Sequence, residues 1–429
     1  MENRYFIEGI RIIGNESSSE ALKEFGKEGF EISGGNPTIS YFESIDDPNI
    51  SVEIKDVVDV DQFVSKLGLI GGESLALKVK FTQEGDTEDK DFEITSDHKL
   101  ILNKVTDVIT TSTKQLATLQ FISQETLVDE TARLSKRFEG NIIDIVRDIL
   151  KKDKKGIQTT KKFNTQPRSL NPFKDRSFNK YTFVGNMKRP FDTIQWLAPK
   201  AATDEEDCGF LFFENFDGYN FRSIKTMIES KPIKTYTRVD STLYGEDSLN
   251  IVEAKLNQTT NLGMNLRMGT YASKTIYINL ETAEKTVLDY KISKTGIKNP
   301  PKLPGDLDQH PSRLMLRLID PGAMQKGSKK DQEEREADLA KYQNKSYSRV
   351  NLLNSYSMQV MVPFSADLRV GSTIELKFPY KTDDRNTKKG KSDFTDLSGI
   401  YLIRTLRHEI GNNQAQTHMR IVRDTFSAK

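Results

Sequence analysis

Few residues in this chain are suited to chemistry, and the histidines are the first to consider. There are four: His98, His310, His408 and His418. His408-Glu409 begins like the zinc-protease helix motif, but position 412 holds Asn where that motif needs its second histidine. His408 and His418 fall in neighbouring predicted strands and can approach each other, yet no third zinc ligand is recognisable. We therefore expect structural roles for the histidines and no metal site.

The remaining candidates for catalysis are equally incomplete. Gly68 to Gly72 is glycine-rich, but it lacks the Lys-Ser/Thr ending of a phosphate loop and precedes a strand instead of a helix. Cys208 follows an acidic run that disfavours a reactive thiolate. Adjacent carboxylates such as Glu205-Glu206 carry no sign of being held across a cleft, as a glycosidase requires. We expect no catalytic residues, no cofactor site and no enzyme activity.

The most informative feature of the sequence is an internal repeat of predicted strands joined by a charged loop. Gly72 begins Gly-Glu-Ser-Leu-Ala-Leu-Lys, and Gly371 begins Gly-Ser-Thr-Ile-Glu-Leu-Lys. In both copies a charged loop and two further strands follow: 82–91, 100–105 and 115–121 in the first, and 381–393, 400–406 and 416–422 in the second. The offset stays between 299 and 301 residues. Chance alternation explains one matching strand, but strands kept in order at a constant offset favour a duplication.

Composition limits what kind of protein carries this repeat. A chain of 429 residues is too long for one ordinary core, so we expect two to four domains. With 36% hydrophobic and 29% charged residues and a net charge of +1, it reads as a globular protein without a general attraction to nucleic acid or membranes. Its single cysteine excludes an internal disulfide and suits assembly in a reducing cytoplasm. Neither a signal peptide nor an apolar run of about 20 residues is apparent, so membrane insertion is not expected.

Hydrophobic patterning predicts a β-rich α+β protein in four parts. Residues 1–112 form a first β-barrel, and residues 113–235 form a mixed α/β connecting domain that begins with helices over 126–136 and 142–150. Residues 236–292 and 346–429 together form a second barrel, with a possible helix near 247–256 and a hairpin of 264–268 with 275–279. Between them, residues 293–345 form a proline-rich excursion and a charged helix. The class is thus two antiparallel β-barrels joined by a mixed domain.

One segment suggests a different function. Residues 151–180 contain ten Lys or Arg and two Asp. Such a run is usually a solvated loop or an extended linker, which is our interpretation here. The alternative is a nucleic-acid-binding protein that uses this segment to contact phosphates.

Several ordered motifs resemble one known family. They include residues 364–374, 397–403 and 406–410 near the C-terminus, and 121–123, 130–142, 191–197 and 209–214 upstream. Together they are similar to the baseplate central hub protein of T-even-like contractile-tailed bacteriophages, which is related to hub modules of type VI secretion spikes. The resemblance is spread over most of the chain, and the order of the motifs strengthens it.

The resemblance implies a structural protein of the virion tail baseplate, assembled in the host cytoplasm. It implies a homotrimer with two tail-tube-like barrels per subunit, giving six quasi-equivalent units that adapt a hexameric tube to a trimeric spike. Implied partners are tail-tube or tube-initiator proteins, the central spike, baseplate wedge proteins, and the tape-measure protein and DNA that pass through a central channel. No glycine-rich β-repeat follows residue 425, so we expect the spike to be a separate chain. A tail lysin is the enzymatic alternative.

The repeat also suggests contact residues, since equivalent loops of the two modules should meet the tube alike. Candidate tube-interface residues are Thr82, Asp86, Glu88 and Lys90 in the first loop and Lys381, Asp383, Arg385, Lys388 and Lys391 in the second. Candidate inter-barrel strand residues are Leu75, Leu77, Ile374 and Leu376.

Overall fold

The computed structural model describes residues 4–26, 28–35, 37–59, 67–82, 90–110, 115–165, 179–203, 208–238, 249–258, 261–279, 283–294, 307, 310–319, 342–353, 356–379, 397–411 and 414–423. Most of the secondary structure is antiparallel β-sheet, which confirms the β-rich α+β class. The predicted repeat appears as two three-strand units, β5 (Ser74–Thr82), β7 (Leu100–Thr110) and β8 (Gln115–Ser123), and β20 (Thr373–Lys377), β21 (Gly399–Gly411) and β22 (Gln414–Arg423).

Backbone contacts at the start of each unit are the same. Gly72 N donates to Leu102 O at 2.8 Å, and Gly371 N donates to Ile403 O at 3.1 Å. Both glycines have positive φ, 90° and 76°, which a residue without a Cβ adopts at little cost. One β-bulge also coincides, because the register shifts after Leu102 in the first unit and after Ile403 in the second; β7 has a further shift, between Thr106 and Ile109, that β21 lacks. Equivalent hydrogen bonds and an equivalent bulge, at offsets of 299 to 301 residues, confirm that the repeat is structural.

The other strands of each module extend these units. The first module adds β1 (Arg4–Ile13), β2 (Phe30–Glu31), β3 (Thr38–Ser44), β4 (Ser51–Asp59) and β6 (Lys90–Ile94), with α1 (Glu20–Lys23) and η1 (Ser96–His98). The second adds β14 (Thr235–Thr237), β15 (Glu253–Gln258) and β19 (Tyr356–Pro363). By their pairing, β15 and β19 correspond to β3 and β4.

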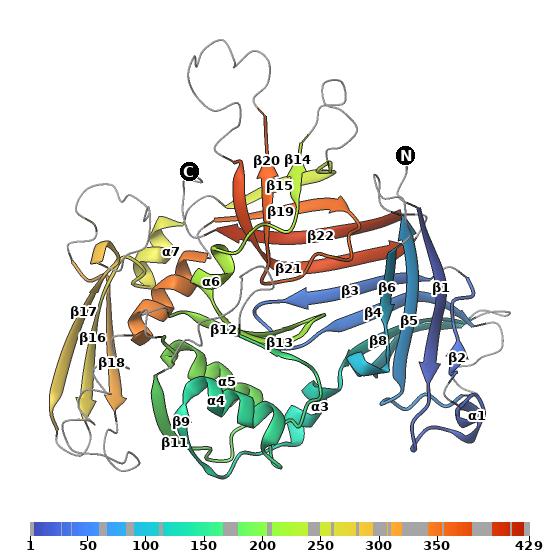
Figure 1. Ribbon diagram of the computed structural model, residues 1–429, viewed down its shortest axis with the longest axis horizontal. Helices are drawn as coiled ribbons and strands as arrows, with labels where there is room; N and C mark the ends of the chain where they lie inside the picture. Colours follow the sequence, from blue (N-terminus) through green and yellow to red (C-terminus); the bar gives the residue numbers. More distant parts are fainter. Residues whose placement is uncertain are drawn as a thin grey trace.

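The two modules are parts of one sheet. Neighbouring strands follow the order β15-β19-β22-β21-β3-β4-β8-β7, and the pair β21–β3 joins the modules. Figure 1 shows these strands stacked across the molecule, with β1, β5 and β6 standing at one side. The described strands of this chain do not close into a barrel; the sheet remains open, with β15 at one end.

The connecting domain covers one side of this sheet. Its elements are α3 (Gln124–Thr131), β9 (Arg137–Asn141), α4 (Ile142–Arg147), η2 (Asp148–Lys152), β10 (Phe163–Asn164), β11 (Lys180–Val184), α5 (Pro190–Leu197), η3 (Ala198–Lys200), β12 (Phe210–Asn215), β13 (Gly218–Ser223) and α6 (Ile224–Ile228). The predicted helical face at 142–150 is buried in its core. The basic segment is not a linker where it is described, since Ile157 is buried and β10 pairs with β13. Residues 166–178 lie outside the described residues.

A small sheet, here called the satellite sheet, forms a separate layer (left in Figure 1). It contains β16 (Ala272–Asn279), β17 (Lys285–Lys291) and β18 (Arg313–Ile319). Along the chain, η4 (Ile292–Lys294) follows β17, and a helix over 342–353 comes after β18. The predicted strand 264–268 is wrong. Residues Leu262–Arg267 form α7, capped by Asn261, because Leu262 and Leu266 share one helical face against Tyr271. The predicted charged helix falls mostly outside the described residues.

Two large apolar cores hold the layers together. One spans both modules and includes Phe213 of β12, in the β12–β13 hairpin (here called the connecting hairpin), and Met227 of α6; the other lies within the connecting domain. The first core is continuous across β3 and β21, so the two modules share one apolar core.

The glycine at the second repeat gives a test of this geometry. A Cβ on Gly371 would lie 2.5 Å from Phe213 Cζ, and φ is 76°. We expect Gly371→Ala to lower the free energy of unfolding by about 1–3 kcal/mol, measured by urea denaturation. Gly263→Ala is the matched control, because its Cβ would meet no atom within 4 Å in α7. An unchanged stability in Gly371→Ala would contradict the described backbone conformation.

Candidate functional site: a shared sheet with two open edges

The junction between the modules shows how one edge of the module is used. β21 is long enough for two partners: its first part pairs with β20 and its second part, Thr405 to Ile410, pairs with β3. The equivalent strand β7 pairs with β5 only near its start, at Ser74 and Ile101. Among the described residues, no strand occupies the remaining edge of β7 from Lys104 onward. The second part of β7 therefore has an unpaired edge where the second part of β21 has β3 as its partner.

The complementary edge lies at the other end of the sheet. β3 pairs with both β4 and β21, whereas its counterpart β15 pairs only with β19 in the described part of the chain. Leu256 occupies the position of Tyr41, because each faces the equivalent residue of the next strand. Tyr41 is 1% exposed and Leu256 is 41% exposed. On β7, Val105 is partly exposed, whereas Leu406, which occupies the same position by its pairing, is fully buried. Each open edge thus exposes an apolar residue that the internal junction buries.

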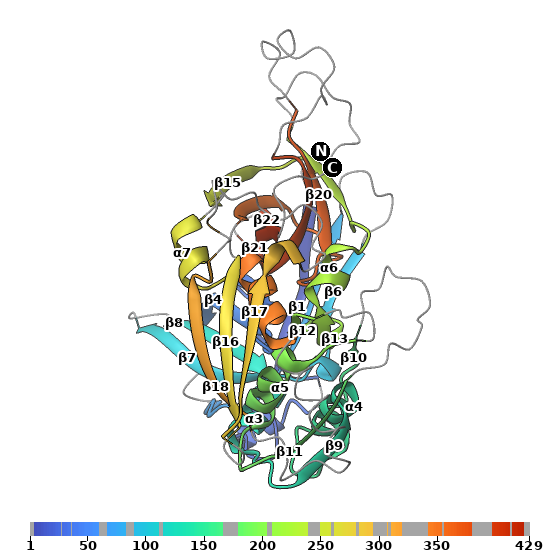
Figure 2. The ribbon, with the colours of Figure 1, turned by 90° about the vertical axis from the view of Figure 1, so that its left-hand side faces the viewer.

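The sheet has one covered face and one open face. Figure 2 looks along the strands and shows β1, β6, β12 and β13 on one side of the run from β15 to β8. On the other side, which we call the open face, cross-strand pairing places polar residues in rows that continue across the junction. One row reads Gln416, Glu409, Ser40, Glu53, Gln120 and Lys104.

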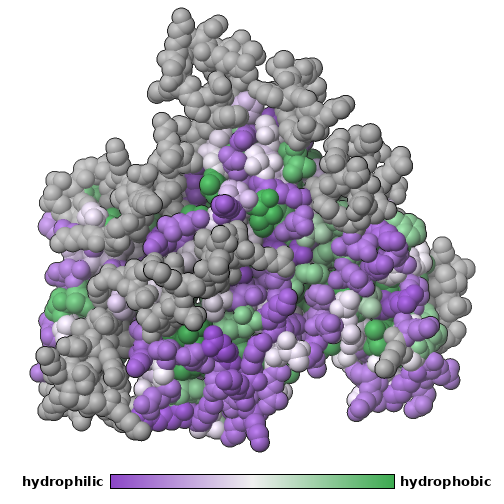
Figure 3. Space-filling model, in the orientation of Figure 1, coloured by the Kyte–Doolittle hydropathy of each residue, from purple (hydrophilic) through white to green (hydrophobic). Residues whose placement is uncertain are grey.

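The open face carries charges of both signs. Arg407 Nη2 lies 3.0 Å from Glu409 Oε2, and Lys55 Nζ lies 3.3 Å from Glu53 Oε2. A hollow of about 290 Å³ near β15 is also lined by side chains of both signs, including Glu253, Lys255 and Arg420. The opposite view in Figure 3 is also mostly hydrophilic, with scattered apolar spots.

A buried carboxylate fixes the junction itself. Glu43 on β3 is fully buried and accepts from Val370 N at 3.0 Å, in the second module, and from Phe216 N at 2.7 Å, in the connecting hairpin. It also accepts from Tyr41 Oη at 2.7 Å. Burial raises the pKa of Glu43, while nearby Arg369 acts in the opposite direction. One side chain therefore binds three parts of the chain to each other.

An aromatic cluster surrounds this carboxylate. Arg369 lies 4.4 Å from the centre of the Phe216 ring, and His408 stacks on Tyr41 at 5.8 Å. His408 is fully buried, with Nδ1 2.9 Å from Thr417 Oγ1. Burial, assisted by Arg369, holds the pKa of His408 well below its ordinary value. The imidazole is therefore a neutral packing group of the junction.

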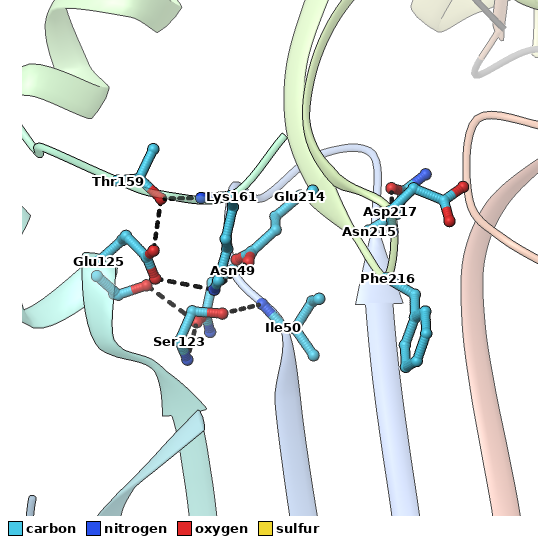
Figure 4. Close-up of polar contacts among 12 residues, drawn as sticks. Asn49, Ile50, Ser123, Glu125, Thr159, Lys161, Glu214, Asn215, Phe216 and Asp217 are labelled. Carbon is cyan, nitrogen blue, oxygen red and sulfur yellow. Dashed lines mark hydrogen bonds and ion pairs between the residues drawn. The ribbon is translucent and has the colours of Figure 1, made fainter. Parts of the chain in front are cut away.

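A second buried network joins α3, β12 and the segment before β10 within the connecting domain (Figure 4). Lys161 Nζ lies 2.8 Å from Glu125 Oε2 and 2.6 Å from Glu214 Oε1, and all three side chains are nearly inaccessible to solvent. Thr159 Oγ1 donates to Glu125 at 2.6 Å. Burial and Glu125 raise the pKa of Glu214, whereas Lys161 lowers it. The two carboxylates that share Lys161 have a structural role, because the hollow that Glu125 lines does not include Glu214.

The predicted inter-barrel residues are described, but their role is untested. Leu75, Leu77, Ile374 and Leu376 are at most 1% exposed and lie in the core that both modules share. β5 and β20 do not pair with each other; the strands that join the modules are β3 and β21.

The predicted tube-interface residues fall mostly outside the described part of the chain. Thr82 ends β5 and Lys90 begins β6. The others, Asp86, Glu88, Lys381, Asp383, Arg385, Lys388 and Lys391, lie outside the described residues.

Glu43 and Glu214 were not predicted. The strand alternation offered a signal for Glu43, because Ile39, Tyr41 and Glu43 share one face of β3 and two of the three are apolar. A carboxylate on an otherwise apolar strand face indicates a buried polar contact. The sequence did not indicate which backbone groups would meet it.

The other chemical candidates do not assemble. His408 and His418 lie on opposite faces of the sheet, one buried and one partly exposed. Among the described residues, no group of three or more His, Cys, Asp or Glu side chains is arranged to hold a metal ion. Cys208 is buried, at 5% exposed. No helix in the described ranges is long and apolar enough to cross a membrane.

Comparison with known proteins gives a likeness of fold. No protein-family model matches the sequence, and no curated protein is significantly similar to it. The crystal structure of a tail protein from Neisseria meningitidis covers 99% of this chain and 97% of its own, with a TM-score of 0.51 and 10% identity. The 43 kDa tail protein of prophage MuSo2 from Shewanella oneidensis covers 97% of this chain and 99% of its own, with a TM-score of 0.50 and 11% identity. The chain has the fold of these tail proteins, as the resemblance in sequence motifs predicted.

Burial of His408 predicts how stability depends on pH. The unfolded chain binds this proton below about pH 6.5, whereas the folded chain resists it, so unfolding becomes easier as pH falls. We expect His408→Gln to reduce this loss between pH 7 and 5.5 by at most about 1.4 kcal/mol per pH unit. Urea denaturation of both proteins measures the difference.

Other buried groups also make stability depend on pH, so His408→Gln must be compared directly with the wild type. Burial raises the pKa of Asp129 to about 6, which acts in the opposite direction over part of this range. The difference between variant and wild type removes this contribution. Identical pH slopes would contradict a neutral, buried His408.

Proposed function

We propose that the protein is the structural hub of a contractile phage baseplate, built as a homotrimeric ring. The observation that supports this most is the pair of open edges. The internal junction joins β3 to the second half of β21, and the same two elements recur, unoccupied, as β15 and the second half of β7. A second copy can therefore repeat the junction, with its β15 along β7 of the first copy.

This contact is head-to-tail, because it joins different edges of the two copies. Every copy can therefore have both of its edges paired only in a closed ring. Eight consecutive strands, from β15 to β7, would come from each copy. Three copies supply six modules, which gives pseudo-sixfold symmetry from a threefold assembly. The predicted tube-like barrels then take the form of one barrel shared among subunits, since a single chain leaves its sheet open. Closure also removes both exposed edges, which otherwise favour aggregation.

The open face becomes the wall of a central channel in this assembly. Many of its side chains are polar, and its ion pairs Arg407–Glu409 and Lys55–Glu53 join charges of opposite sign. A wall that carries both signs of charge holds a passing polyanion less tightly than a purely basic wall would. That property suits transit of DNA and of a tape-measure protein.

Symmetry gives the ring its role as an adaptor. Six like modules match a hexameric tail tube, and the threefold arrangement matches a trimeric spike. We assign tube contact to the loops 82–91 and 381–396, because they follow equivalent strands of the two modules. Wedge proteins and a tube initiator are the further partners, and the location is the tail of the virion. The role is structural and needs no cofactor or catalysis.

Substitution at the open edges tests the ring. We expect the wild-type chain to form a trimer, three times 48.8 kDa, in size-exclusion chromatography with light scattering. Leu256→Asp and Val105→Asp place a charge where the junction buries an apolar group, so each should yield folded monomers.

Leu316→Asp serves as the control, because Leu316 is 66% exposed on the satellite sheet, away from both edges. It should remain trimeric. A wild-type monomer at all concentrations, or trimers of both edge variants, would refute the proposed contact.

Removal of the loops tests tube docking separately. A chain lacking residues 83–89 or 382–395 should form the trimer and fail to bind tail tubes in co-sedimentation and electron microscopy. Normal docking after both deletions would overturn the assignment of these loops.

A further inference from the structure

A basic hollow lies where the first module meets the connecting domain, on the side of α3. It has a volume of about 640 Å³ and runs between α3 and the turn 154–159. Lys99, Arg133, Lys154 and Lys155 line it. No ion pair engages any of these four cations within the described ranges, so their charges are not offset locally.

The carboxylate in the hollow does not compensate them. Glu125 lines the hollow but is 3% exposed, accepts from Thr159 and is paired with Lys161 behind it at 2.8 Å. Its charge is thus partly offset by this buried lysine, which also pairs with Glu214 and is not part of the lining. The four outer cations remain in excess, and like charges gathered in one concave site favour an anionic ligand.

Local bonds orient part of this site. The Arg133 Nη1 donates to Glu130 O and Ala132 O at the end of α3, which leaves the rest of the guanidinium for other acceptors. Lys155 Nζ donates to Ser135 Oγ at 2.7 Å, a neutral partner that leaves its charge uncompensated. Both cations are therefore held at the rim without being neutralised.

Apolar groups lie among the cations. Val128 and Ile157 line the hollow, and Met187 at its rim is 61% exposed. No aromatic ring lines it, so unpaired bases have nothing to stack on, as single-stranded nucleic acid would require. Alternating cationic and apolar groups fit a peptide that carries both carboxylates and aliphatic side chains.

We propose that this hollow binds an acidic, partly aliphatic peptide segment of another protein. The site is formed within one chain and does not involve the open edges of the sheet. Its occupation is therefore independent of the ring, and a monomeric edge variant should bind the same peptide.

Fluorescence anisotropy of the full chain with a fluorescein-labelled decapeptide of alternating Glu and Leu tests the proposal. We expect saturable binding that weakens as salt rises. The double variant Lys154→Glu, Lys155→Glu should bind at least tenfold more weakly. Lys151→Glu, Lys152→Glu is the matched control, with the same charge change on neighbouring exposed residues that do not line the hollow; it should stay within about twofold of wild type.

A second variant and a second probe complete the experiment. Met187→Glu adds a carboxylate at the exposed rim without disturbing a buried group, so it should also weaken the peptide by at least tenfold. Absence of peptide binding, equal losses in both lysine pairs, or equal or tighter binding of a labelled ten-nucleotide thymidine strand would each overturn the proposal. The last result would favour nucleic acid.

Discussion

The pairing of β3 with the second half of β21 is the contact on which the rest of the structure depends. It makes one sheet of two modules that lie about 300 residues apart in sequence, and it carries the core continuously across them. It also sets the relative rotation of the modules, because backbone hydrogen bonds fix both register and direction. Any closed ring made from this chain inherits its geometry from this one pair of strands.

Glu43 makes the junction specific as well as stable. Truncating Glu43 leaves the buried N–H donors of Val370 and Phe216 without partners, which costs about 1–3 kcal/mol for each. An apolar residue at this place would pack but would not select Val370 N and Phe216 N as partners. The Glu125–Lys161–Glu214 network does the same among three parts of the connecting domain. Both devices lie where separate parts of the chain must meet in one arrangement.

The two copies have diverged where their surroundings differ. β1 pairs antiparallel with β5, whereas β14 pairs parallel with β20, because the second module is entered from the connecting domain. The satellite sheet is inserted between β15 and β19, where the first module has only the turn 45–50 between β3 and β4. The strands of the repeated unit kept register and bulge, whereas the elements around them did not. The same structural role for β5, β7 and β8 and for their counterparts β20, β21 and β22 explains why these strands pair alike in both modules.

The sequence by itself determined the β-rich class, the repeat with its equivalent strands, and the helices of the connecting domain, because these follow from local patterns and from comparison of the chain with itself. It was wrong about residues 247–256 and 264–268. Residues of high helical propensity form β15 because β19 offers it a partner, and Leu262 and Leu266 form a helix because Tyr271 covers them. Only the tertiary structure decided that the modules share one sheet, that Glu43 joins three parts of the chain, and that β7 and β15 keep open edges. Strand pairing and burial are non-local, and a strand with one partner has the same sequence pattern as a strand with two.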